Sequence, residues 1–267
     1  MRLKAASAAL AVVLSVLTLG NVGASAGSKK HSETAAYSWY CKNNSEGRPP
    51  ELPSEFSFIS ENGGYYIDTK ANEENKVIYL TFDAGYENGN IAKILDTLKA
   101  HGATGAFFVL GNLIKRDTAL VKRMVDEGHL VCNHTNLHHD MTKTVSLEKF
   151  RAELESLNSI MKEYCGCELA PFYRPPEGRF SESNLKNAKE LGYKTVFWSF
   201  AYADWDNNKQ MSSEKAYNKV ISHTHNGEVI LLHPTSCTNA QILDRLLTEW
   251  EAQGYRFGTL YELTKSD

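Results

Sequence analysis

The sequence has no large excess of either charge and no basic tract. Its 267 residues include 29 Lys and Arg against 32 Asp and Glu, which gives a formal net charge of −3 at pH 7. Proteins that bind nucleic acid as their main ligand present clustered positive charge to the phosphate backbone. The composition therefore argues against nucleic acid as a partner.

Cysteines are few, and no two of them form a Cys-x-x-Cys pair. A zinc site built from cysteine usually contains such close pairs, so their absence argues against one. Two of the cysteines are one residue apart and would rarely bond to each other. Because the total is odd, the sequence predicts no particular disulfide. The five are Cys41, Cys132, Cys165, Cys167 and Cys237.

Long apolar runs are also missing, except near the N-terminus. Arg2 and Lys4 precede the charge-free run Ala5–Leu19, and Ala24–Ala26 follows as an A-x-A site. This order is typical of a secretory signal peptide, whereas a membrane span needs about 20 apolar residues. We expect residues 1–26 to be a signal peptide, the mature protein to have no membrane span, and its location to be secreted or in the cell wall. An uncleaved anchor is the alternative.

The next segment, residues 27–75, is polar and rich in turn-forming residues such as Asn62–Gly64. Tyr37 and Trp39 make it too aromatic for a free linker. We therefore expect a loop-rich N-terminal arm that packs against a main domain over residues 76–267.

From residue 77 onward, helical segments that end in glycine alternate with β-rich runs. Glycine is favoured just past a helix end because the chain turns there through a left-handed conformation. The alternation predicts an α/β fold with a parallel sheet covered by helices, closed as a barrel or partly open barrel, with a doubly wound open sheet as the alternative. The seven expected strands are Val77–Phe82, Ala106–Val109, Leu130–Asn133, Pro171–Arg174, Lys194–Trp198, Val229–Leu232 and Arg256–Leu260.

Ionisable residues follow five of these strands, at the carboxyl ends where both architectures place function. A carboxylate after a buried strand is hard to explain by packing, because burying an unpaired charge costs several kcal/mol or more. The alternative for the first of them is a solvated aspartate that opens a turn before a helix at Ile91. The five are Asp83, His134, Arg174, Asp204 and His233.

His134 and His138 have the spacing i, i+4, which would put both imidazoles on one face of a helical turn, as a divalent metal site requires. Two surface histidines are the alternative. With Asp83 opposite them, the pair predicts a hydrolase in which a metal polarises a carbonyl and lowers the pKa of water toward ~7. Asp83 could then act as base and His233 as acid.

Neighbouring residues fit this chemistry. Arg174 could pair with Asp83 and keep it ionised, and the stiff Pro175-Pro176 turn could aim the Glu177 N–H into an oxyanion hole. An ordinary ion pair is the alternative for Arg174, and a core histidine is the alternative for His233. We expect Trp205 at the site and Trp198 in the core.

Five motifs in this order resemble those of the polysaccharide deacetylases, also called the NodB-homology domain or carbohydrate esterase family 4. The match runs from about Val77 to the C-terminus. The resemblance implies a distorted (β/α)7 barrel, a divalent metal that is usually zinc, and hydrolysis of N-acetyl groups of amino sugars. It also implies Asp83 as base, tethered by Arg174, His233 as acid, and the two histidines as metal ligands. The motifs are Thr81–Gly85, His134–His138, Arg174–Gly178, Asp204-Trp205 and Leu231–His233.

The sequence departs from the family at Ala84, where the usual motif has an aspartate that ligates the metal. Two histidines alone make a weak site, which water or substrate must complete. The same departure, followed by Tyr86, Glu87 and Asn88, resembles the subgroup that deacetylates N-acetylmuramic acid in peptidoglycan. The resemblance implies glycan strands whose stem peptide an amidase has removed as the substrate. It also implies muramic δ-lactam formation in spore cortex and a location in the intermembrane space of the forespore.

We therefore expect a secreted muramic acid de-N-acetylase, with Glu177, Trp205, Asp204, Tyr86 and Asn88 near the substrate or its oxyanion. A deacetylase of N-acetylglucosamine in peptidoglycan or chitin-like chains is the alternative enzyme. A non-catalytic cell-wall-binding domain with a degenerate site is the alternative of another class.

Overall fold

The computed structural model describes residues 32–42 and 47–265, so the expected signal peptide over residues 1–26 lies outside the described part. A nine-stranded sheet forms its centre, in the order β2-β8-β6-β5-β4-β3-β10-β9, and β11 pairs with β3. All the strand pairs of this sheet are parallel. The strands are β2 (Gly64–Tyr65), β3 (Val77–Ala84), β4 (Gly105–Val109), β5 (Leu130–Asn133), β6 (Ala170–Tyr173), β8 (Lys194–Val196), β9 (Phe200–Ala201), β10 (Glu228–Leu232) and β11 (Arg256–Phe257).

One extended segment, residues 194–201, closes the sheet on itself. Its first part, β8, pairs with β6, and its second part, β9, pairs with β10. Between them, the Ser199 N–H donates to the Val229 carbonyl at 2.9 Å. The distorted (β/α)7 barrel is thereby confirmed, and the doubly wound open sheet is excluded.

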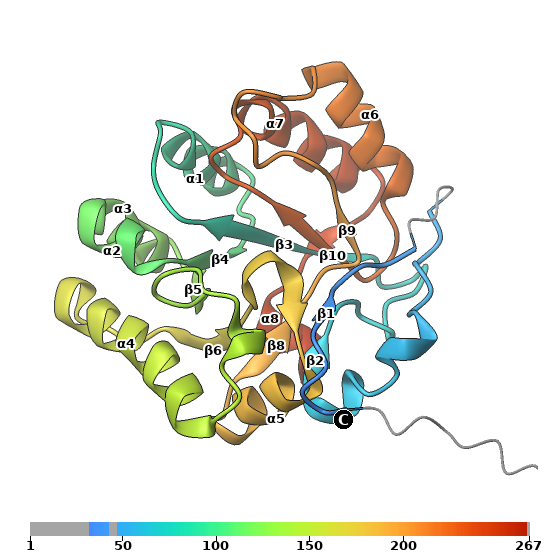
Figure 1. The fold of residues 1–267 in the computed structure, drawn as a ribbon. Helices are drawn as coiled ribbons and strands as arrows, with labels where there is room; N and C mark the ends of the chain where they lie inside the picture. The colour runs from blue at the N-terminus through green and yellow to red at the C-terminus, as the bar shows by residue number, and fades with distance from the viewer. Residues whose placement is uncertain (1–31, 43–46, 266–267) are drawn as a thin grey trace, which may run out of the picture. The chain divides into compact units, whose positions relative to one another are not determined.

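Helices surround the strands (Figure 1). Alternate residues of β3 face opposite sides: Ile78, Leu80 and Phe82 pack in the cluster that includes helix residues, whereas Val77 and Tyr79 pack with residues of the neighbouring strands. The helices are α1 (Ile91–Ala100), α2 (Gly111–Arg116), α3 (Thr118–Asp126), α4 (Leu147–Cys165), α5 (Glu182–Glu190), α6 (Ser213–His223), α7 (Cys237–Ala252) and α8 (Leu260–Leu263), with short 3-10 turns η1 (Ser54–Phe56), η2 (Ser60–Asn62), η3 (Met141–Lys143) and η4 (Pro176–Gly178).

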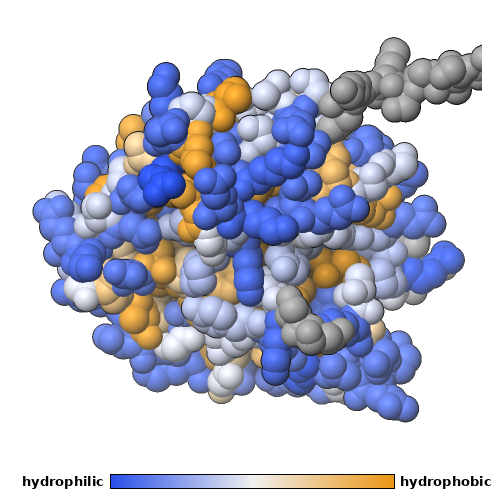
Figure 2. All heavy atoms as spheres, turned by 90° about the horizontal axis from the view of Figure 1, so that it is seen from below, coloured by the Kyte–Doolittle hydropathy of each residue, from blue (hydrophilic) through white to orange (hydrophobic). Residues whose placement is uncertain are grey.

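The periodic patterns account for these elements. The four apolar positions of α1 that share a face are all buried, and β3 is buried along nearly its whole length. Within the described ranges, no helix combines the length and the apolar character that crossing a bilayer demands. The face in Figure 2 is mainly hydrophilic, with apolar residues in separate spots.

The last expected strand is shorter than predicted. It ends at Phe257, and Leu260 instead begins α8, because Thr259 precedes that helix and its hydroxyl accepts from the Glu262 N–H. The very short strands, including β1 (Tyr37–Ser38) and β7 (Arg179–Phe180), which pair antiparallel, were not predicted. Two residues are too few to show a period.

Aromatic residues N-terminal to β3 pack against the barrel. Trp39 is 5% exposed and stacks on Phe197 with ring centroids 4.6 Å apart. Its indole N–H donates to the Trp198 carbonyl at 2.9 Å, and its backbone N–H donates to the Gly178 carbonyl at 2.8 Å. Trp198 closely follows β8, and Gly178 ends the turn η4 that follows β6, so this segment supports loops at that end of the barrel.

Glu228, the first residue of β10, is fully buried although it is acidic. One carboxyl oxygen accepts from the His225 N–H at 3.2 Å, and the other has no hydrogen-bond partner. Burial raises the pKa of Glu228 well above its ordinary value, against the smaller effect of that hydrogen bond. Folding therefore favours the neutral form of this carboxyl.

Replacing this carboxyl by an amide should remove a pH-dependent loss of stability. Because folding raises the pKa of Glu228, the free energy of unfolding falls as the pH rises above 4.5, the ordinary value of the group. Near neutral pH we expect Glu228→Gln to be more stable than the parent chain by about 1 kcal/mol or more, with the gain vanishing in acid. Urea titrations over a pH series measure this, with exposed Glu74→Gln as control. Curves of the same shape for both variants would contradict the assignment.

Candidate active site

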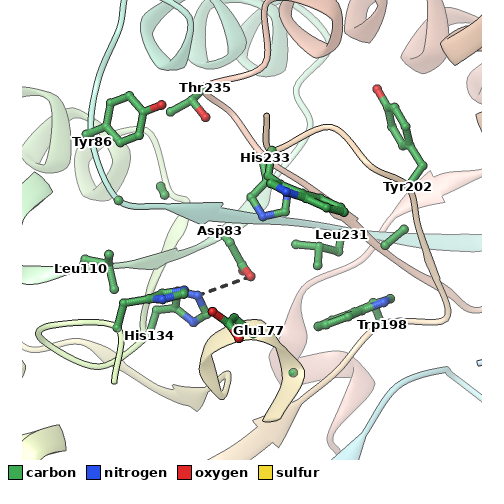
Figure 3. A pocket seen from close by; sticks show the side chains of 16 residues that line it. Asp83, Tyr86, Leu110, His134, Glu177, Trp198, Tyr202, Leu231, His233 and Thr235 are labelled. Atoms are coloured by element: carbon green, nitrogen blue, oxygen red, sulfur yellow. Dashed lines mark ion pairs between the residues drawn. The ribbon is translucent and has the colours of Figure 1, made fainter. Parts of the chain in front are cut away.

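A pocket of about 710 Å³ opens at the carboxyl ends of the strands (Figure 3). Figure 3 shows Asp83 between His134 and His233, with all three side chains directed into the same space. The convergence expected from the strand ends is therefore present. The lining residues are Asp83, Ala84, Gly85, Tyr86, Leu110, His134, His138, Glu177, Gly178, Trp198, Ala201, Tyr202, Trp205, Leu231, His233 and Thr235.

Asp83 lies near the end of β3, with its side chain 10% exposed. One carboxylate oxygen accepts from Arg174 at 2.9 Å, and the other lies 3.5 Å from Nε2 of His134. Burial opposes ionisation, but electrostatic interactions with His134, Arg174 and His233, together with the hydrogen bond from Arg174, outweigh it and hold the pKa of Asp83 below its ordinary value. The site thus keeps Asp83 as a carboxylate that can accept a proton.

Arg174 lies behind Asp83, fully buried and outside the pocket lining. Besides its bond to Asp83, its guanidinium donates to the Val196 and Phe197 carbonyls at 2.9 and 3.1 Å and to the Thr81 hydroxyl at 2.9 Å. The guanidinium carbon lies 4.2 Å from the centroid of the Phe108 ring. These contacts fix the direction from which Arg174 approaches Asp83, so the pair has the geometry of a tether.

His134 and His138 meet without the expected helical turn. No residue from 134 to 140 is helical, and both Thr135 and His138 have positive φ, 68° and 58°. The two imidazole rings nevertheless lie 5.1 Å apart, at 71° to each other. The helical prediction was wrong because a loop that turns through left-handed residues brings the rings together by another route.

Side chains hold this loop in its unusual conformation. The Asn133 side-chain oxygen accepts from the Thr135 N–H at 2.9 Å, and the Thr135 hydroxyl accepts from the His138 N–H at 3.0 Å. Glu153 of α4 accepts from the backbone N–H groups of Asn136 and Leu137. Within the described ranges, the third non-glycine residue with positive φ is Glu177, at 56°, also on the pocket. Such residues gather at functional sites, where the surroundings hold them.

The two histidines fit a metal only in part. Nδ1 of His134 lies 2.8 Å from the Arg174 carbonyl, which can only accept, so Nε2 is left for the pocket. Burial lowers the pKa of His134 to about 4, which keeps the ring neutral as a ligand must be. Yet among the described residues no three His, Cys, Asp or Glu side chains are placed to hold an ion, and Ala84 presents only a methyl group. Further ligands must come from water or substrate.

His233 faces Asp83 across the pocket and is held from behind by Asp204. Nδ1 lies 2.7 Å from one Asp204 oxygen, and the His233 backbone N–H donates to the other at 2.8 Å. Burial lowers the pKa of His233, but the hydrogen bond and charge of Asp204, with the charge of Asp83, raise it above its ordinary value overall. The ring lines the pocket with 25% of its side chain exposed, so it is not a core histidine.

Asp204 itself is 1% exposed and is not part of the pocket wall. Asp204 was expected near the substrate or its oxyanion, whereas in this structure its carboxylate accepts hydrogen bonds from His233 and from a neighbouring asparagine behind the wall. Its position next to Trp205, whose exposed ring does line the pocket, gave no indication of this.

The remaining predicted residues divide between the wall and its support. Tyr86 lines the pocket and its hydroxyl accepts from Asn207 at 2.7 Å, whereas Asn88 donates to the Thr235 carbonyl at 2.8 Å and lies outside the lining. Trp198 was expected in the core, but its half-buried ring forms part of the wall. Its indole lies beside Gly178, where an added Cβ would meet it at 2.8 Å.

Sequence reasoning missed four residues of the wall. Leu110, Ala201, Tyr202 and Thr235 each follow or end a β-rich run close to a predicted site residue. Their apolar or neutral polar side chains carry no chemical signal, and only proximity to the strand ends could have indicated them.

Removing the charge that faces Asp83 should destabilise the fold. Arg174→Met leaves the buried carboxylate without its tether, and we expect the free energy of unfolding to fall by about 3–5 kcal/mol. Adding Asp83→Asn removes the uncompensated charge and should restore part of that loss. Urea titrations of the two single variants and the double variant measure the coupling. A loss in the double variant equal to the sum of the losses in the two single variants would show that the two side chains do not interact.

Several known proteins are similar to this chain in sequence. A family model described as polysaccharide deacetylase matches residues 70–196. The peptidoglycan-N-acetylmuramic acid deacetylase PdaA of Bacillus subtilis (strain 168) is 42% identical over 226 residues, which cover 84% of this chain and 84% of that protein. A peptidoglycan-N-acetylglucosamine deacetylase of Bacillus cereus is 32% identical over 205 residues, 75% of this chain and 93% of that protein.

Solved structures agree. The structure of Bacillus subtilis PdaA, a family 4 carbohydrate esterase, matches with a TM-score of 0.81 and 41% identity, covering 86% of this chain and 97% of that one. A family 4 carbohydrate esterase from Bacillus anthracis matches with a TM-score of 0.70 and 36% identity, covering 88% of this chain and 98% of that one. The resemblance read from the five motifs is confirmed. The chain belongs to the polysaccharide deacetylases of carbohydrate esterase family 4, which are hydrolases acting on N-acetyl groups.

Proposed function

We propose that the chain is a secreted de-N-acetylase that removes the acetyl group from N-acetylmuramic acid residues of peptidoglycan. The observation that carries the hydrolytic part is the pair of opposed groups in one pocket, Asp83 tethered by Arg174 and His233 held by Asp204. Opposite pKa shifts in neighbouring titratable groups are typical of a base and an acid that work together. The muramic preference rests on the resemblance and on the similarity to PdaA.

In the proposed reaction, Asp83 accepts a proton from the water that attacks the acetamide carbonyl carbon. His233, protonated and held through Nδ1 by Asp204, donates the proton at Nε2 to the amide nitrogen as the carbon–nitrogen bond breaks. Acetate and a free amine on the sugar leave. Arg174 keeps Asp83 ionised and aimed throughout.

Two further contributions belong to the proposal. Deacetylases of this family are in general metal-dependent. When bound at His134 and His138, a divalent ion such as zinc supplies Lewis-acid polarisation of the acetamide carbonyl. The backbone N–H of Glu177 is our candidate for the oxyanion hole, since η4 holds this residue on the pocket wall in a left-handed conformation. Tyr86 and Trp205 are candidates for contacts with the sugar rings.

The biological setting follows from resemblance. Removal of the signal peptide over residues 1–26 would release the enzyme toward the cell wall. Its substrate would be glycan strands whose stem peptides an amidase has removed. In a spore former, the product would lead to muramic δ-lactam in the cortex, and the enzyme would act between the forespore membranes.

Mass spectrometry of amidase-treated peptidoglycan incubated with the mature protein tests substrate and base together. We expect muramic residues to lose one acetyl mass, with the loss abolished or reduced by about 10²-fold or more in Asp83→Asn. Parallel incubations with a chelator and with added zinc test the metal. Loss of acetyl from glucosamine alone would favour the alternative enzyme. Sugar binding without any loss would favour the non-catalytic wall-binding domain.

Ala84→Asp tests why the third protein ligand is missing. A carboxylate at this position of the pocket wall should tighten zinc binding, measured by calorimetry, because it adds an anionic ligand beside the two histidines. It should also repel the lactyl carboxylate of muramic sugars and so impair their deacetylation. Ala84→Asn, which has the same shape without the charge, is the control. Unchanged activity on muramic sugars in Ala84→Asp would contradict this explanation.

A further inference from the structure

A buried asparagine on α7 lies directly behind the Asp204–His233 pair. Asn239 is 1% exposed, and its side-chain nitrogen donates to Oδ2 of Asp204 at 2.6 Å and to the His233 carbonyl at 3.1 Å. The same Asp204 oxygen also accepts from the His233 backbone N–H. Its side-chain oxygen accepts from the hydroxyl of Tyr202, a residue of the pocket wall. The amide thus contacts both members of the pair and one wall residue.

The partners fix the orientation of this amide. The His233 carbonyl can only accept a hydrogen bond, and the Asp204 carboxylate accepts three, one from Asn239 and two from His233. Both therefore require the nitrogen of Asn239 on their side. The oxygen is then left for Tyr202, whose hydroxyl can donate to it. In the series of hydrogen bonds that runs from Tyr202 through Asn239 to Asp204, every donor has one acceptor. The donors and acceptors of this series therefore cannot be exchanged.

The same series of hydrogen bonds determines which ring nitrogen of His233 carries the proton. Because Asp204 can only accept, Nδ1 of the ring carries a proton and Nε2 remains for the pocket. Asn239 and the His233 backbone N–H both donate to the Asp204 oxygen that does not face the ring, and together they hold the carboxylate in this orientation. Both the position and the protonated nitrogen of His233 therefore depend on a residue that does not reach the pocket.

We propose that Asn239 is a positioning residue for the acid of the reaction, and that Tyr202 extends this support to the pocket wall. The proposal concerns the donor nitrogen of Asn239 and not merely its place in α7. It rests on the proposed function for the role of His233 as acid, but the arrangement of the ring is measurable without any activity.

A second asparagine provides a matched comparison. Asn239 and Asn184 are each the third residue of a helix, and in both helices the backbone N–H is accepted by a capping serine at 3.1 Å. Both side chains are buried, but that of Asn184 donates to the Thr144 carbonyl, away from the pocket. Substitution of Asn184 therefore changes the same local structure without touching His233.

Two variants, Asn239→Asp and Asn239→Leu, distinguish the effect of losing the donor group from the effect of any substitution at this position. In Asn239→Asp, two carboxyl groups face each other, and in acid a shared proton can replace the amide donor. We expect kcat to approach that of the parent at low pH and to fall at least about tenfold below it as the pH rises, with KM little changed. Asn239→Leu cannot donate at any pH, so its kcat should be lower by a similar factor throughout.

Nitrogen-15 NMR of the histidine rings gives the readout that is independent of activity. In the parent chain the neutral ring of His233 should carry its proton on Nδ1, and in Asn239→Leu the form protonated on Nε2 should become detectable. Tyr202→Phe removes a single hydroxyl and is expected to fold, with kcat lowered by about threefold. Asn184→Asp should lose stability while keeping the parent's pH profile and tautomer.

The outcomes are distinct. Parent-like kcat, pH profile and tautomer in the Asn239 variants would overturn the proposal, as would a pH-independent loss in Asn239→Asp equal to that in Asn239→Leu. A similar change of pH profile in Asn184→Asp would show that the effect reflects general destabilisation, and would also overturn it. If the parent chain deacetylates no sugar, the proposed function fails, and the tautomer of His233 still decides the role of Asn239.

Discussion

The buried ion pair between Arg174 and Asp83 is the interaction on which the site depends. A guanidinium with no exposure is tolerated only because it donates hydrogen bonds on several sides: to the Asp83 carboxylate, the Thr81 hydroxyl and two carbonyls of the segment that closes the barrel. Arg174 thereby joins three parts of the sheet at one point. A loss of barrel closure would remove half of its partners, so the closure of the sheet and the charge of Asp83 are linked.

Asp83 and His233 are each held by an oppositely charged residue, and their pKa values are shifted in opposite directions. Asp83 has a cation behind it and keeps a lowered pKa, whereas His233 has an anion behind it and keeps a raised one. Each is supported by a residue that does not line the pocket, Arg174 for the carboxylate and Asp204 for the imidazole. Residues behind the wall therefore contribute, with those on it, to the opposite pKa shifts of Asp83 and His233.

Loops held in unfavourable backbone conformations complete the site. Thr135, His138 and Glu177 all have positive φ, and each adjoins or lines the pocket. Strain of this kind persists only when surrounding contacts fix it, as Asn133 and Glu153 do for the histidine loop. Contacts within the folded chain therefore hold the two histidines in place.

The sequence by itself determined the alternation of helices and strands, the parallel sheet, and the convergence of Asp83, His134 and His233, because periodicity and strand ends depend on near neighbours in the chain. Tertiary structure decided the rest. The loop route that joins His134 to His138, the place of Trp198 on the wall, and the contact of Asn239 with Asp204 involve left-handed turns or residues distant in sequence. Such contacts arise only when the elements pack, so no local pattern contains them.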